Sequence, residues 1–166
     1  MPTGSQPGSN ARIGVIADTH SLMRTEALQA LEGSNQIIHA GDVGRQEVLQ
    51  ALQSIAPVAA VRGNIDREVW ALALPRTRVV EAAGFLLYVL HDVQDLDLDP
   101  AAAGFHAVIS GHSHLPSIEH RRGVLYLNPG SAGPQRFRMP ITLARIHIRQ
   151  GKLEAELVDL EEGAGG

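Results

Sequence analysis

Five short segments of the sequence carry side chains of the kind that bind metal ions: Asp18-Thr19-His20, Gly41-Asp42, Gly63-Asn64, His91-Asp92 and Gly111-His112-Ser113-His114. Divalent transition ions accept carboxylate oxygen and imidazole nitrogen as ligands. Two such ions about 3.5–4 Å apart can hold both the attacking and the leaving oxygen of an in-line displacement. A carboxylate suits the position between two ions, because its negative charge reduces the repulsion between them. The residue types therefore favour a two-metal hydrolytic centre.

Each of these segments follows a predicted strand. Short apolar runs predict buried strands, at residues 11–17, 36–40, 57–61, 85–90 and 107–110. Helical periodicity at 22–31 and 45–55 separates the first three strands, which implies right-handed crossovers and a parallel sheet. Ligand sites in open α/β sheets form at the carboxyl ends of strands, where these segments lie. The glycines before Asp42, Asn64 and His112 fit sharp turns or close approach to a ligand.

The second half of the chain changes to antiparallel patterns. Glycine-containing turns predict three hairpins, with strands at 76–81 and 85–90, 118–122 and 124–127, and 141–149 and 152–160. Alternating apolar residues in the last pair suit a sheet with one wet face. We expect an α/β domain with a mixed sheet or two packed sheets covered by helices. A single domain would span residues 11–160, with flexible tails at 1–10 and 161–166 that are rich in Gly, Ser and Pro.

The amino-acid composition limits the classes of binding partner that we expect for this protein. The 166 residues carry a net charge of -4, which disfavours general attraction to nucleic acid or to an anionic membrane surface. The chain has no cysteine, which excludes disulfides and thiolate ligands and fits a reducing cytoplasm. No apolar run approaches the ~20 residues of a membrane-spanning helix. We expect a cytoplasmic protein that acts on a small molecule, and a homo-oligomer is left open.

Taken singly, each motif also has a structural explanation. Gly-Asp after a strand is usually a turn, and His112 and His114, although alternate strand residues share a face, also fit a solvated pair. The five motifs together favour the metal site. His39, inside an apolar strand, is more simply a hydrogen-bonded core histidine. Arg136 and Arg138 could reach a phosphate, although surface arginines are commoner, and Asp95, Asp97 and Asp99 are most typical of a solvated face.

The ordered set Asp-x-His, Gly-Asp, Gly-Asn-x-Asp, His and Gly-His-x-His resembles the calcineurin-like metallophosphoesterases. The pattern is most similar to their small bacterial and archaeal phosphodiesterase branch, which also carries an Asn-Pro-Gly-Ser segment, here residues 128–131. The resemblance covers residues 13–160. It implies an α/β fold of the metallophosphoesterase type, a four-layer α-β-β-α sandwich with mixed sheets.

The resemblance also implies roles for individual residues. One metal ion would take Asp18, His20 and His114, and the other would take Asn64, His91 and His112. Asp42 would bridge the two ions, with a hydroxide between them as the nucleophile. Asn64 could also hold a phosphate oxygen, and Asp66 would orient a ligand histidine or its loop. We expect two divalent ions, manganese first, with iron, zinc, nickel and cobalt also compatible.

Two positions depart from the family pattern. Larger members often carry a histidine after the asparagine of Gly-Asn, where this chain has Ile65, which cannot protonate a leaving group. The residue after His91 is Asp92, where glycine is common, and the acidic stretch 93–99 could alter the rim of the site. The resemblance implies a two-metal phosphoesterase that hydrolyses phosphodiesters, with phosphomonoesters next. The alternative is a non-catalytic interaction scaffold of the same fold, which the complete ligand set disfavours.

Overall fold

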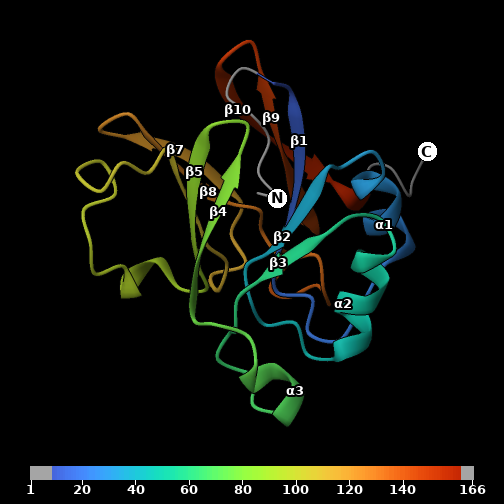
Figure 1. Ribbon diagram of the computed structural model, residues 1–166. Helices are drawn as coiled ribbons and strands as arrows, with labels where there is room; N and C mark the ends of the chain where they lie inside the picture. The colour runs from blue at the N-terminus through green and yellow to red at the C-terminus, as the bar shows by residue number, and fades with distance from the viewer. Residues whose placement is uncertain (1–8, 162–166) are drawn as a thin grey trace.

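A computed structural model describes residues 9–161 and shows two five-stranded sheets packed face to face (Figure 1). The first sheet has the order β10-β9-β1-β2-β3, and the second has the order β4-β5-β6-β8-β7. Both sheets mix parallel and antiparallel pairs. The predicted α/β sandwich with two mixed sheets is therefore confirmed. The predicted tails lie largely outside the described residues.

The first sheet is built from β1 (Ala11–Ile16), β2 (Gln36–His39), β3 (Val58–Ala60), β9 (Thr142–Arg149) and β10 (Lys152–Asp159). The crossovers between β1, β2 and β3 run through α1 (Thr25–Leu31) and α2 (Gln46–Gln53), as the helical periodicity predicted. Both helices cover the outer face of this sheet, where Leu31 and Leu52 pack against Ile16 and Ile37. The helices thus leave the carboxyl ends of β1, β2 and β3 free for the loops that follow.

The second sheet is built from β4 (Thr77–Ala82), β5 (Phe85–Leu90), β6 (Ala107–Ile109), β7 (Ser117–Arg121) and β8 (Val124–Asn128). Its outer face packs against Leu96, Leu98 and Phe105, which belong to the segment between β5 and β6. That segment contains one 3-10 turn, η1 (Val93–Asp95), in place of a long helix. The residues 97–100 (Asp-Leu-Asp-Pro) favour turns over a helix.

The main core lies between the two sheets. Ile13, Val15 and Ile38 of the first sheet pack in one cluster with Leu87 and Ile109 of the second. Burying both faces of β1, β2 and β6 explains why these strands are nearly continuous apolar runs in the sequence. The rigid sandwich fixes the ends of β1, β2, β3, β5 and β6, and the five predicted ligand segments begin at those ends.

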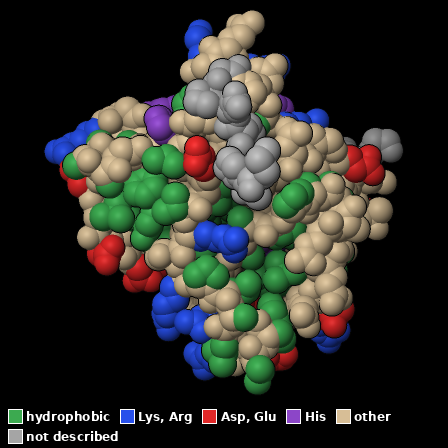
Figure 2. Space-filling model, viewed as in Figure 1, with side chains coloured by type: hydrophobic (Ala, Val, Ile, Leu, Met, Phe, Trp, Pro, Cys, Tyr) green, Lys and Arg blue, Asp and Glu red, His purple; other side chains and the backbone are tan. Residues whose placement is uncertain are grey.

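One short helix has no counterpart among the predicted elements. The helix α3 (Val69–Leu72) lies between β3 and β4 and projects from the sandwich (Figure 1). Two of its residues are among the exposed apolar side chains, Val69 at 86% and Leu72 at 57%. On the face shown in Figure 2, hydrophobic side chains and Lys or Arg side chains lie next to each other around this helix. None of the described helices is long and apolar enough to span a membrane.

Candidate metal centre

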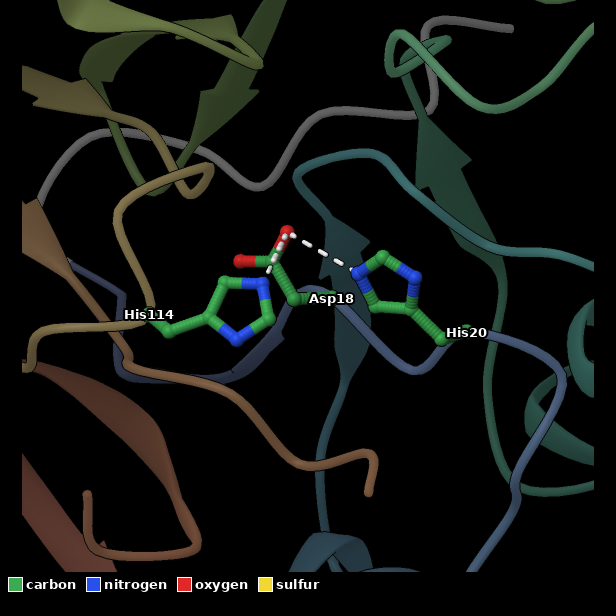
Figure 3. Close-up of side chains that lie close together, drawn as sticks. All are labelled: Asp18, His20 and His114. Carbon is green, nitrogen blue, oxygen red and sulfur yellow. Dashed lines mark ion pairs between the residues drawn. The ribbon is translucent and has the colours of Figure 1, made fainter. Parts of the chain in front are cut away.

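Two overlapping groups of buried and partly buried side chains form at the ends of β1, β2, β5 and β6. The first group consists of Asp18, His20 and His114, and the second of Asp18, Asp42 and His91. Within each group the potential ligand atoms all lie within 4.8 Å of one another. Figure 3 shows the rings of His20 and His114 facing the Asp18 carboxylate from two sides. Asp18 belongs to both groups, and therefore the two groups form a single centre.

The two carboxylates each use one oxygen to fix the loop and leave the other free toward the histidines. Asp18 Oδ2 accepts a hydrogen bond from the backbone N–H of His112 at 3.0 Å. Its Oδ1 lies 3.6 Å from His114 Nε2 and 4.0 Å from His20 Nε2. Asp42 Oδ1 accepts from the backbone N–H of Ile65 at 3.1 Å. Each free oxygen is thus oriented before any ligand arrives.

Asp42 lies between histidines that the family resemblance assigns to different ions. Its Oδ2 is 3.5 Å from Nε2 of His20 and 3.3 Å from Nε2 of His91. The ring of His91 is oriented by its Nδ1–H, which donates to the carbonyl of Ala40 at 2.8 Å, so the Nε2 lone pair faces Asp42. This arrangement fits a carboxylate that bridges two cations.

Three of the convergent atoms have no hydrogen-bond partner although they are buried: Asp18 Oδ1, His20 Nε2 and His91 Nε2. Buried polar atoms are nearly always paired, because leaving one unpaired costs roughly 1–3 kcal/mol. Carboxylate oxygen and imidazole nitrogen in this arrangement are the donors that divalent cations take. The residues present therefore fit a metal ion.

The pKa shifts of the side chains in this centre also fit a bound cation. Burial raises the pKa of Asp18 from 3.8 to about 7, against the opposing charge of His91. Burial alone would lower the pKa of His91, but the Asp42 carboxylate 3.3 Å away outweighs it and raises that pKa above its ordinary value. Burial lowers the pKa of His20 and of His114. The centre thus favours a positive charge beside Asp42, which a divalent cation would supply.

Asn64 and His112 lie at the outer side of this centre. Together with His91 they line a cavity of about 720 Å³. The His112 ring is 5.2 Å from that of His91, centroid to centroid, and its Nε2 is 3.6 Å from Asp92 Oδ2. The structure therefore gathers Asp18, His20, Asp42, His91 and His114 in the buried centre, and places Asn64 and His112 beside it. Asp92, which stands where glycine is common in the family, thus contacts one of the predicted ligands.

The backbone at the centre adopts conformations that are rare for these residues. Among the described non-glycine residues, eleven have a positive φ, and five of them are predicted ligands: Asp18, His20, Asp42, His112 and His114. Such conformations cost about 1–3 kcal/mol each and persist where the surroundings enforce them. Neighbouring glycines permit the close packing, since a Cβ at Gly63 would clash with Asp42 and a Cβ at Gly41 would lie 2.6 Å from His91 Nδ1.

Asp66 holds two of the ligand loops together. Its carboxylate accepts hydrogen bonds from the backbone N–H groups of Val43 at 3.1 Å, Gly44 at 3.0 Å and Gly63 at 2.9 Å. These bonds join the loop after β2, which carries Asp42, to the loop after β3, which carries Asn64. The side chain is only 3% exposed, so water cannot replace them readily. The contacts support the prediction that Asp66 orients a loop.

Sequence reasoning did not find a second set of positioning residues. Asn128 donates to the carbonyl of Gly111 at 2.9 Å and to Ser113 Oγ at 3.1 Å, while Ser131 Oγ donates to the carbonyl of Asp18 at 3.0 Å. These bonds give the Asn-Pro-Gly-Ser segment a physical role: it ties the loop of His112 and His114 to the end of β1. The segment was visible in the sequence only as a mark of the family.

His39 is confirmed as a hydrogen-bonded core histidine. It is 0% exposed, and its Nδ1 accepts from the backbone N–H of Gly41 at 3.1 Å. The proton of the neutral ring therefore lies on Nε2, which donates to Thr19 Oγ1 at 3.0 Å. Thr19 Oγ1 in turn donates to the carbonyl of Val43 at 2.8 Å. The ring thus links the loops that carry Asp18 and Asp42.

Residues 12–151 match the calcineurin-like phosphoesterase superfamily domain, and the chain belongs to this family. A probable metallophosphoesterase of Methanocaldococcus jannaschii is 38% identical over 93% of this chain and 84% of its own length. The structure of an archaeal phosphodiesterase aligns with a TM-score of 0.75 at 21% identity, covering 89% of this chain and 99% of the other.

The vacuolar sorting protein Vps29 of Entamoeba histolytica, in a zinc complex, shares the fold as well. It aligns with a TM-score of 0.69 at 21% identity, covering 90% of this chain and 99% of the other. The sequence-based resemblance to calcineurin-like metallophosphoesterases is therefore confirmed. At these identities the two solved structures establish the fold alone.

Proposed function

We propose that this chain is a two-metal-dependent phosphodiesterase. The observation that carries the proposal is the set of three buried, unpartnered atoms, Asp18 Oδ1, His20 Nε2 and His91 Nε2, that converge on Asp42. In a chain of the calcineurin-like family, such a set is best explained as a pair of cation sites that share one carboxylate. Two divalent ions there would activate water and offset negative charge on the phosphate.

The seven predicted ligands divide into two sets around Asp42. Asp18, His20 and His114 would hold one ion, which is supported by their buried grouping. His91, His112 and Asn64 would hold the other, on the side of the centre that opens to the cavity. Manganese is our first expectation for both ions. Asp66 would act as a positioning residue, because its three backbone hydrogen bonds keep the loops of Asp42 and Asn64 in register.

The size of the adjoining cavity favours a diester over a monoester as substrate. The cavity of about 720 Å³ beside Asn64 and His112 offers room for a second organic group on the phosphate. Ile65 occupies the position where a proton donor for the leaving group would lie, and it is 42% exposed. A leaving group would therefore take its proton from water, which suits an activated ester whose leaving group is stable as an anion, such as a phenolate. An archaeal phosphodiesterase also shares the fold.

The test compares two chromogenic substrates on protein of assayed metal content. Metal-stripped protein reloaded with manganese should hydrolyse bis-p-nitrophenyl phosphate faster than p-nitrophenyl phosphate. Asp42→Ala should lose both bound metal and turnover, while the matched control Asp97→Ala, an exposed carboxylate, should keep both. An Asp42→Ala protein with normal metal-dependent turnover would overturn the assignment.

The alternative function is a non-catalytic scaffold of the same fold. A folded protein that binds no metal and hydrolyses neither ester would favour it. The cytoplasmic location stays a prediction, which fractionation of the native cells would test.

A further inference from the structure

The cavity beside the metal centre extends well beyond the predicted ligands. Its volume of about 720 Å³ is within the ~300–1,000 Å³ typical of small-molecule sites. Asn64, His91 and His112 form the end nearest the metal centre. The rest is lined by the segments 62–77 and 90–95, which include three arginines, Arg62, Arg67 and Arg76. A scissile phosphate held at the metal centre would leave most of this volume for the remainder of the substrate.

Arg62 and Arg76 lie at the two ends of the segment 62–77, and these ends run side by side. The backbone N–H of Arg62 donates to the carbonyl of Pro75 at 2.9 Å, which fixes Arg62 next to the residue before Arg76. Arg62 is two residues before Asn64, and two residues span at most about 7 Å. Arg62, the first arginine of the cavity lining, therefore lies close to the predicted metal ligand Asn64.

Two of these arginines have no partner for their charge. Within residues 9–161, the side chains of Arg62 and Arg76 form no hydrogen bond or ion pair, whereas Arg121, Arg122 and Arg145 each pair with a carboxylate. Arg67 differs, because its Nε donates to the carbonyl of Asn64 at 3.2 Å. Arg62 is half-buried and Arg76 is exposed, and both line the same cavity.

The acidic groups of the cavity are engaged or lie on another segment. Asp66 accepts three backbone hydrogen bonds, and Asp92 lies 3.6 Å from His112 Nε2 and accepts from the backbone N–H of Gln94. Asp95 lines the cavity from η1, on the segment that follows β5, whereas the three arginines lie between β3 and β4. An anion in the cavity would therefore be drawn to Arg62 and Arg76.

We propose that Arg62 and Arg76 bind a second phosphate group of the substrate, apart from the scissile one. The guanidinium group matches phosphate oxygens in a two-pronged geometry. Leu72 and Leu90, which line the same cavity, would contact the uncharged part between the two phosphates. This inference rests on the proposed phosphodiesterase function and specifies its substrate class: an organic phosphodiester with an additional phosphate on the alcohol that stays esterified.

The experiment uses two substrates that differ in one group. These are the p-nitrophenyl ester of thymidine 5′-phosphate with and without a 3′-phosphate. For manganese-loaded wild-type protein we expect kcat/KM to be about tenfold or more higher with the 3′-phosphate, since hydrogen bonds between charged groups are worth about that factor or more. The ratio of the two kcat/KM values should fall to about one in the double variant Arg62→Gln/Arg76→Gln. The control Arg78→Gln, an exposed arginine outside the cavity lining, should keep the wild-type ratio.

A binding measurement separates this inference from the proposed activity. Calorimetry on the same proteins should show tighter binding of thymidine 3′,5′-bisphosphate than of thymidine 5′-phosphate, and the double variant should lose that preference. Equal affinity of wild-type protein for the two ligands would overturn the second phosphate site. If neither ester were hydrolysed while the binding preference held, the arginine site would stand and the proposed activity would fail.

Discussion

The buried ring of His39 predicts a specific loss of stability in acid. Its Nδ1 accepts from the N–H of Gly41 and its Nε2–H donates to Thr19, so only the neutral ring satisfies both bonds. Burial, together with the positive charge of His91, lowers the pKa of His39 from 6.5 to about 3. The test therefore lowers the pH and compares the stability of wild-type protein with that of His39→Gln, because glutamine does not titrate.

The sign and size of the change in the free energy of unfolding follow from proton linkage. Between pH 6.5 and about 3 the unfolded chain protonates His39 while the folded chain does not, and hence the stability falls as the pH falls through this window. One pKa unit corresponds to about 1.4 kcal/mol, so lowering the pH from 7.5 to 5 should cost about 2 kcal/mol through this ring. Asp18, whose pKa is raised, contributes with the opposite sign, and it does so in wild type and variant alike.

Urea unfolding of metal-free protein at pH 7.5 and pH 5 measures the effect. The free energy of unfolding of wild type minus that of His39→Gln should be about 2 kcal/mol smaller at pH 5 than at pH 7.5. An unchanged difference between the two proteins would refute the reasoning, because it would mean that the folded ring takes up its proton as readily as the unfolded one.

Three further predictions concern the loops around the centre. Gly63→Ala should lower metal affinity at least tenfold in a metal titration while the protein stays folded, because its Cβ would clash with Asp42; normal affinity would contradict the packing. Asp66→Ala should lower the free energy of unfolding by roughly 3–5 kcal/mol in urea, because three N–H groups, two of them buried, lose a charged acceptor. Metal affinity should fall about tenfold per unit of pH below about 7, because Asp18 takes up a proton there that the ion must displace. Competition with a chelator at several pH values measures this affinity, and an affinity that did not change with pH would contradict the prediction.

Much of the fold follows from local sequence patterns. The runs that became β1, β2 and β6 are buried on both faces, so their continuous apolar residues gave a clear signal. The three hairpins were visible because glycine-containing turns separate the paired strands. The ligand segments were found because strand ends carry ligand sites in such folds. Observed strand boundaries differ from the predicted ones by at most one residue.

Other features depend on contacts between distant segments. Nothing local in the sequence indicates that Asp66 reaches back to Val43 and Gly44, or that Ser131 holds Asp18. The short helix α3 spans four residues, too few for a helical period to appear. The cover of Leu96 and Leu98 over the second sheet is likewise a tertiary contact, although these residues alternate with aspartates as on a solvated face.

The central claim is that two divalent ions at the centre around Asp42 drive phosphodiester hydrolysis. The most direct measurement is turnover of bis-p-nitrophenyl phosphate as manganese is added back to metal-free protein, with bound metal assayed in the same samples. We predict no turnover without metal and a rise that reaches its maximum at two bound ions per chain. Full turnover in metal-free protein, or a maximum reached at one bound ion per chain, would contradict the claim.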